Sequence, residues 1–172
     1  MVTGAAASPG QVAPGDLERV RELLNSWLIP NVTRQPTDEF EQLAGAQGWG
    51  REDSALVREL RDDIRRAVES GDAARLSSWV SRLGLRPVIS DAGVSYQHDA
   101  GPAGDFMTIV LGALTAGQWS RLKACPDCRW VFYDYTRNGS KRWCLMNAGS
   151  PDGRACGTIA KVRRYRDRQA AQ

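Results

Sequence analysis

Residues 125–144 read CPDCRWVFYDYTRNGSKRWC and contain three of the four cysteines of the chain. Cys125 and Cys128 are separated by two residues, a spacing that lets one tight turn direct both sulfurs at a single metal ion. β-prone residues follow, and the Asn-Gly pair at 138–139 is typical of a two-residue hairpin turn. We therefore predict that two strands flank this turn and return Cys144 to the first cysteine pair.

The fourth cysteine, Cys156, begins the basic sequence CGTIAKVRRYRDR, which has a helical pattern. The helix dipole favours a thiolate at this position, so Cys156 is the predicted fourth ligand. Four thiolates around one Zn²⁺ form a closed structural site with no position for a substrate. Disulfides are rare in a reducing cytoplasm, so we favour one structural zinc ion held by Cys125, Cys128, Cys144 and Cys156. Buried or redox-active thiols are the alternative.

The residues before the cysteines are expected to form helices and one hairpin. Apolar residues recur with helical spacing in five segments: 16–31, 37–49, 51–72, 72–85 and 101–125. In the first of these, Leu28 is expected on the buried face and Pro30 is expected to end the helix. Two β-prone runs, around 88–90 and 94–98, flank a turn-like segment and predict a β-hairpin. The last helix is expected to lead directly to Cys125.

Together these patterns predict an α+β fold that is mostly α. The chain has 172 residues and 42% hydrophobic content, enough for one modest domain with a small appendage. We expect a flexible leader over residues 1–15, an α-rich domain over 16–117 and a four-cysteine zinc module over 118–172. The module is predicted to combine a β-hairpin with a C-terminal helix, as in a treble clef or a zinc ribbon.

Charge is distributed unevenly along the chain. Residues 118–172 hold 12 basic and 4 acidic side chains, whereas residues 1–117 hold 11 basic and 16 acidic ones. Arginine suits phosphate binding, because the guanidinium keeps its charge and offers a planar set of donors. A solvated basic surface is the alternative for any one of these side chains. We predict nucleic-acid binding by Arg137, Lys141, Arg142, Lys161, Arg163, Arg164, Arg166 and Arg168.

The large apolar side chains of the tail are expected to be packed. Ile159, Val162 and Tyr165 recur every three residues along the last helix, which predicts that they face inward. Trp130 and Trp143 are expected to form the small core that a zinc module needs. The alternative is that exposed aromatic side chains of the hairpin stack on nucleic-acid bases.

The runs CPDCRWVFYDYTRNGSKRWC and CGTIAKVRRYR resemble the CGNR zinc-finger proteins of bacteria over about residues 119–168. In that family the last cysteine begins a Cys-Gly-Asn-Arg tetrapeptide ahead of a basic helix. Here Thr158 and Ile159 stand in place of Asn and Arg, and the stretch between Cys144 and Cys156 is longer than is usual. The resemblance implies a mainly helical N-terminal domain, called ABATE, which is proposed to sense small molecules in stress-induced transcription regulators.

We therefore expect a DNA-binding transcription regulator without enzymatic activity. Its zinc module would bind double-stranded DNA, and residues 16–117 would sense a small-molecule effector and form a homodimer. A second hypothesis is an interaction protein whose zinc module docks on RNA polymerase or a sigma factor. A third hypothesis is an enzyme with a pocket near His98. It is less favoured, because no nucleophile, phosphate loop or carboxylate pair accompanies this histidine.

Two absences in the sequence bear on location. No run of about 18 apolar residues occurs, and the first residues lack the basic start and apolar run of a secretory signal. We expect a cytoplasmic, nucleoid-associated protein with no membrane partner.

Overall fold

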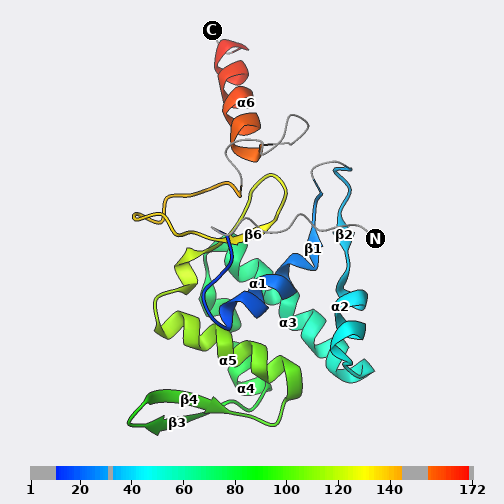
Figure 1. The fold of residues 1–172 in the computed structure, drawn as a ribbon, viewed down its shortest axis with the longest axis vertical. Helices are drawn as coiled ribbons and strands as arrows, with labels where there is room; N and C mark the ends of the chain where they lie inside the picture. Colours follow the sequence, from blue (N-terminus) through cyan, green and yellow to red (C-terminus); the bar gives the residue numbers. More distant parts are fainter. Residues whose placement is uncertain (1–10, 31–32, 145–154, 171–172) are drawn as a thin grey trace.

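The computed structural model describes residues 11–30, 33–144 and 155–170, apart from the side chains of residues 163, 164 and 170 (Figure 1). Its α-helices are α1 (Leu17–Asn25), α2 (Phe40–Gln47), α3 (Arg51–Ser70), α4 (Ser77–Arg82), α5 (Gly101–Thr115) and α6 (Cys156–Ala170). Two 3₁₀ turns accompany them, η1 (Ala73–Leu76) before α4 and η2 (Trp119–Arg121) after α5.

The strands of the described residues form antiparallel pairs. The pairs are β1 (Trp27–Leu28) with β2 (Thr37–Asp38), β3 (Arg86–Ser90) with β4 (Gly93–Gln97), and β5 (Leu122–Ala124) with β6 (Val131–Tyr133). The predicted α+β fold class, mostly α, is thereby confirmed.

The main core lies between α1, α3 and α5. Val20, Leu60, Ile64 and Val110 are completely buried in it. In α3, Leu60, Ile64 and Ala67 recur every three or four residues, so one face of the helix is apolar and packs inward. Burial of this face stabilises α3, because tertiary packing of an apolar face supplies most of the stability of a helix in a folded protein.

The same core continues into the β5–β6 hairpin. Leu122, Val131 and Tyr133 are buried in one cluster with side chains of the helices, and Trp119 of η2 belongs to it as well. This core has members on both sides of the boundary predicted between residues 117 and 118. The hairpin that carries the first two cysteines is therefore held by the helical body.

The first helix is shorter than predicted, since α1 ends at Asn25 and Leu28 lies in β1. β1 pairs with β2, where the carboxylate of Asp38 accepts hydrogen bonds from the buried guanidinium of Arg61 at 2.7 and 3.0 Å. Strand pairing and this ion pair outweigh the helical pattern of the sequence, whose propensity is worth only a few tenths of a kcal/mol per residue.

The helix predicted over 101–125 also ends early, at Thr115. Gly117 has a φ of 68°, a left-handed conformation that commonly terminates an α-helix. The chain then forms η2 and the strand β5, so Cys125 follows a strand and not a helix.

The predicted leader differs from the structure at its last residues. Gln11 and Ala13 are buried, and the Ala13 N–H donates to the carboxylate of Glu18 at 2.6 Å. The packed part of the chain therefore includes residues 11–15. Residues 1–10 lie outside the described residues.

The hairpin predicted between residues 88 and 98 is present as β3–β4. It projects from the body at the end opposite α6 (Figure 1). Ile89 and Val94 are paired across it and are both exposed.

Arg65 of α3 joins the helical body to the cysteine hairpin. Its guanidinium is 7% exposed and donates to the carbonyl oxygens of Leu24 at 2.6 Å, Trp27 at 2.9 Å and Arg129 at 2.8 Å. Glu69 forms an ion pair with it at 3.3 Å. One buried cation thus satisfies carbonyl groups from α1, β1 and the segment between Cys128 and β6.

Replacement of Arg65 by Met should destabilise the fold by about 3 kcal/mol, because three buried carbonyl groups would lose their donor. Urea unfolding of the full chain measures this difference. Arg66→Met is the matched control, since Arg66 lies on the exposed side of the same helix and pairs only with Asp63 in the described part of the chain. Equal stability of the two variants would contradict the assigned role of Arg65.

Candidate metal centre

The turn that holds Cys125 and Cys128 lies between β5 and β6. Lys123 lies opposite Phe132 in this hairpin. The Cys125 N–H donates to the Trp130 carbonyl at 2.9 Å, and the Arg129 N–H donates to the Cys125 carbonyl at 2.9 Å. The two cysteines are therefore fixed on one tight turn, as the spacing predicts.

The prediction that two strands flank a turn at residues 138–139 is wrong. We expected residues around 138–139 to connect two strands, but the partner of β6 is β5, which precedes the first cysteine. Residues 134–143 form a loop instead. The three residues of β5 are too short a run to be recognised as a strand from their alternation alone.

Asp134 organises the loop that leads to Cys144. Its side chain is completely buried and accepts hydrogen bonds from Lys123 Nζ at 2.7 Å, from Thr136 N and Oγ1 at 2.9 and 2.6 Å, and from Lys141 N at 2.9 Å. Burial opposes the charged form, but the hydrogen bonds from Lys123 and Thr136 outweigh it and lower the pKa of Asp134 to about 2.

Lys123 and a second cation, Arg121, also tie the same loop to the hairpin through backbone carbonyl groups. Lys123 Nζ contacts the carbonyl oxygens of Gly139 and of Lys141, the latter at 3.2 Å. Arg121 donates to the carbonyl groups of Thr136 and of Arg137, the latter at 3.3 Å. Sequence reasoning missed these contacts. The only signal was the charge of Arg121, Lys123 and Asp134 beside the apolar residues of the two strands.

The four predicted ligands are brought together by this arrangement. The sulfur atoms of Cys125, Cys128, Cys144 and Cys156 all lie within 4.8 Å of one another, and all four residues are buried. The Cys128 and Cys144 sulfurs are 3.4 Å apart, and those of Cys144 and Cys156 are 3.8 Å apart. A tetrahedron with Zn–S bonds of about 2.3 Å requires sulfur separations of about 3.8 Å. The cluster therefore fits one structural Zn²⁺.

The pKa shifts of the cysteine thiols also indicate that the cluster binds a cation. Contact with the Cys128 and Cys144 thiols lowers the pKa of Cys125, whereas contact with Cys125 raises the pKa of Cys144. Four adjacent thiols thus do not all ionise by themselves, because like charges in a buried site repel. A bound divalent ion reverses this preference and deprotonates every ligand.

A small apolar core surrounds the sulfurs, as predicted. Phe132 is completely buried beside the cysteines, and Trp130 and Trp143 pack against the same cluster. The side-chain amide of Gln11 donates to the Cys144 carbonyl. None of the four cysteines is more than 5% exposed.

The cysteine hairpin docks on α1 and β1 through polar contacts. Asn25 Nδ2 donates to the Val131 carbonyl at 2.9 Å, and the Val131 N–H donates to Asn25 Oδ1 at 2.7 Å. The Ile29 N–H donates to the Cys128 carbonyl at 3.0 Å. The Asn25 side chain and the Ile29 N–H thereby form hydrogen bonds with the hairpin that a neighbouring strand would otherwise form.

The predicted nucleic-acid-binding side chains lie on the loop and on α6. Arg137 and Arg142 are exposed on the loop, while Lys141 is half-buried with Nζ 5.1 Å from the Phe132 ring centre. On α6 the exposed basic side chains of the described part are Lys161, Arg166 and Arg168. The side chains of Arg163 and Arg164 are not among those that the structure describes.

The prediction that α6 buries an apolar face is wrong. Val162 is 44% exposed and Tyr165 is 58% exposed, and only Ile159 is half-buried. α6 begins at Cys156 and extends away from the helical body (Figure 1). Within the described residues, no second element lies beside the exposed part of this helix, so Val162 and Tyr165 have no apolar surface to pack against.

The histidine singled out from the sequence is packed against α5. Its Nε2 lies 3.4 Å from a carboxylate oxygen of Asp105, and its side chain is 13% exposed. A Cβ atom at Gly104 would lie 2.2 Å from His98 Nδ1, so the ring occupies the space that this glycine leaves. Tyr96 is half-buried on β4 and Asp99 is exposed, with Arg86 at 3.3 Å.

Comparison with known protein families agrees with this geometry. Residues 121–169 match the family model described as CGNR zinc finger. The resemblance stated from the sequence is confirmed for this part of the chain. No curated protein matches the sequence. Within the described residues, no helix combines the length and the apolar content that crossing a bilayer requires.

The purified protein should contain about one zinc ion per chain, and Cys156→Ser should lose it as fully as Cys125→Ser does, because a structural site needs all four ligands. Atomic emission spectroscopy of the desalted variants measures the zinc content. A full equivalent of zinc in Cys156→Ser would show that the fourth ligand is another group.

Replacement of Asp134 by Asn should weaken zinc binding by about tenfold, because the loop that presents Cys144 would lose its charged acceptor. Competition with a chromogenic chelator measures the affinity. Asp167→Asn on α6 is the matched control, since this exposed carboxylate has no described partner. An Asp134→Asn affinity equal to that of the control would refute the organising role of Asp134.

Proposed function

We propose that this protein is a DNA-binding transcription regulator whose zinc module presents basic side chains to the phosphate backbone. The observation that carries the proposal is the exposure of Arg137, Arg142, Lys161, Arg166 and Arg168 on the loop and helix that the cysteine site joins. A metal-stabilised scaffold holds these cations in place, which lowers the entropy that binding costs. The match to a zinc-finger family supports a nucleic-acid partner.

The isolated position of α6 supports binding in a groove of double-stranded DNA. The helix extends away from the body (Figure 1), and its described side chains from residue 161 onward are exposed. The major groove admits an α-helix of this width. Phosphate contacts by arginines would position the helix, and one or two further side chains would read base edges.

The helical body would supply the sensing and dimerising part of the regulator. A homodimer is proposed because one module of this size buries little surface on DNA. In this proposal the protein works in the cytoplasm of a bacterium, on the nucleoid, and catalyses no reaction. A small-molecule effector would act through the contacts that join α1 and β1 to the cysteine hairpin.

The decisive experiment is selection of genomic DNA fragments by the zinc-loaded protein at near-physiological salt, followed by sequencing of the retained fragments. Enrichment of a discrete, repeated site is expected of a regulator. Unselective retention that disappears with a modest increase in salt would reject sequence-specific regulation, because it reports charge alone.

Replacement of Arg166 and Arg168 by Gln should weaken DNA binding and reduce the slope of log affinity against log salt by about 2, since each phosphate contact contributes about 0.9. Fluorescence anisotropy at several salt concentrations measures both quantities. Arg51→Gln with Arg75→Gln is the matched control, with the same change in net charge on exposed positions of the body. Equal slopes for both double variants would remove α6 from the interface.

A second function is favoured by the exposure of Val162 and Tyr165. Apolar side chains on a helix that nothing in the described structure covers suit docking on a protein, and the proposed partner is RNA polymerase or a sigma factor. Affinity purification after nuclease treatment distinguishes the two proposals. Stoichiometric recovery of polymerase subunits, lost with Val162→Ser and Tyr165→Ser, would favour the docking protein.

A further inference from the structure

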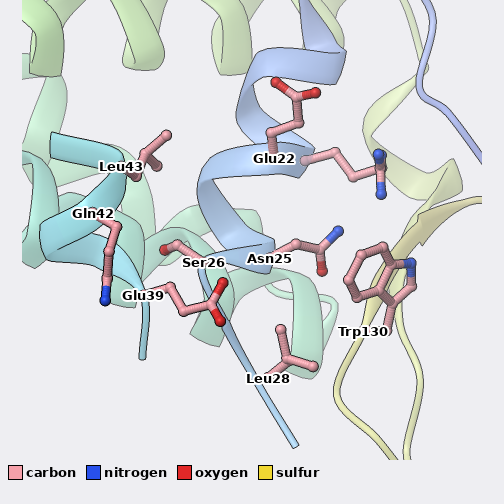
Figure 2. A pocket seen from close by; sticks show the side chains of 9 residues that line it. Glu22, Asn25, Ser26, Leu28, Glu39, Gln42, Leu43 and Trp130 are labelled. Carbon is pink, nitrogen blue, oxygen red and sulfur yellow. The ribbon is translucent and has the colours of Figure 1, made fainter. Parts of the chain in front are cut away.

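A cavity of about 460 Å³ lies where the helical body meets the cysteine hairpin. Its lining comes from α1, β1, α2 and Trp130 of the metal-site turn. Figure 2 shows Leu43, Gln42 and Glu39 on one side, Trp130 on the other, and Asn25 and Ser26 between them. The volume is within the range of small-molecule sites, and the mixture of apolar walls with a few polar groups is typical of them.

The charges around this cavity favour a cation. Glu22 and Glu39 line it, and neither carboxylate forms a salt bridge within the described part of the chain. The one lining cation, Arg21, is already neutralised, because its Nε donates to Glu18 at 2.7 Å and its other nitrogens contact Glu18 and the Val131 carbonyl. The free charge that a ligand would meet is therefore negative.

The helix dipole does not decide the sign of the ligand's charge. Asn25 and Ser26 stand at the C-terminal end of α1, where backbone carbonyl groups concentrate partial negative charge, but Arg65 of α3 donates to the Leu24 carbonyl there at 2.6 Å. The preference for a cation therefore rests on the Glu22 and Glu39 carboxylates, which distinguish the cavity from the basic surface of the loop and α6.

The apolar residues that line the cavity indicate the chemistry of the rest of the ligand. Leu28 and Leu43 offer aliphatic surface, and the indole of Trp130 faces them across the opening (Figure 2). Such walls fit a short apolar or aromatic body, while the carboxylates and the Asn25 and Gln42 amides fit a hydrogen-bonding cationic head.

Two of the lining residues are connected directly to the metal site. Asn25 exchanges two hydrogen bonds with Val131, as described above. The Trp130 carbonyl accepts the N–H of the ligand Cys125 at 2.9 Å. A molecule that rests on Trp130 and Asn25 therefore stabilises the turn that carries the first cysteine pair.

We propose that this cavity binds a small organic cation, with a protonated amine or guanidinium head and an apolar body, and that the bound cation rigidifies the cysteine hairpin. This inference deepens the proposed sensing role, and it rests on that role for its biological use. It locates the effector site at the junction of body and zinc module and assigns the chemical class of its ligand.

The test uses three probes of similar size: 2-phenylethylammonium, neutral 2-phenylethanol and anionic 3-phenylpropanoate. Each is titrated into the zinc-loaded full chain, and the NMR signals of the Trp130 indole N–H and the Asn25 side-chain amide are followed. The ammonium probe should shift both signals saturably and bind about tenfold more tightly than the other two. Equal affinities for the three probes, or no saturable shift with any of them, would overturn the proposal.

Variants separate the cavity from other acidic surfaces. Glu22→Gln with Glu39→Gln should weaken binding of the ammonium probe by about tenfold, because both free carboxylates are lost while the shape is kept. Glu52→Gln with Asp91→Asn makes the same change in net charge at exposed positions elsewhere and should leave the affinity unchanged. Equal losses in the two double variants would show nonspecific attraction and reject the site.

Hydrogen exchange tests the link to the metal turn. Saturation with 2-phenylethylammonium should slow exchange of the Cys125 and Val131 amides relative to amides of β3–β4, because their acceptors lie on Trp130 and Asn25. Unchanged protection would refute the proposed rigidification. None of these measurements uses DNA, so their failure and a failure of DNA selection are separate results.

Discussion

Four thiolates in a sphere a few ångströms wide cannot exist together without a cation between them, and the C-terminal part of this chain is built around that constraint. The sulfurs come from a tight turn, from the end of a long loop and from the start of α6. The loop is also tied to the hairpin through Asp134, Lys123 and Arg121, and Phe132 is buried beside the sulfurs. Coordination by one ion would therefore add to a hydrophobic core that a segment of this size can make only small.

The metal site is nevertheless not an independent unit. β5 and β6 bury their inner side chains in the core of the helical body, and Arg65 and Asn25 bond the backbone around the first cysteine pair. The Arg65 guanidinium is buried and well partnered, which makes its removal costly and its geometry well defined. The Asn25 side chain and the Ile29 N–H also hydrogen-bond to the hairpin that carries Cys125 and Cys128.

This connection suggests how one small chain can combine recognition with response. In the two proposals, the basic loop and α6 bind a polyanion, and the cavity between α1, α2 and Trp130 binds a cation. Both proposed sites adjoin the cysteine hairpin. The proposed coupling between them would run through the backbone hydrogen bonds at Trp130 and Val131.

Features that depend on local spacing could be predicted from the sequence. These are the CPDC turn, the helix that begins at Cys156, the apolar face of α3, the β3–β4 hairpin, the metal site and the family resemblance. Three features depend on contacts between distant segments and could not be predicted: β6 pairs with β5, α1 ends at Asn25, and Val162 and Tyr165 face solvent. The same holds for Arg65, Asp134 and Asn25, whose hydrogen bonds connect distant segments. A buried arginine and a surface arginine look alike in a sequence, because what separates them is the set of distant carbonyl groups that only the folded chain brings within reach.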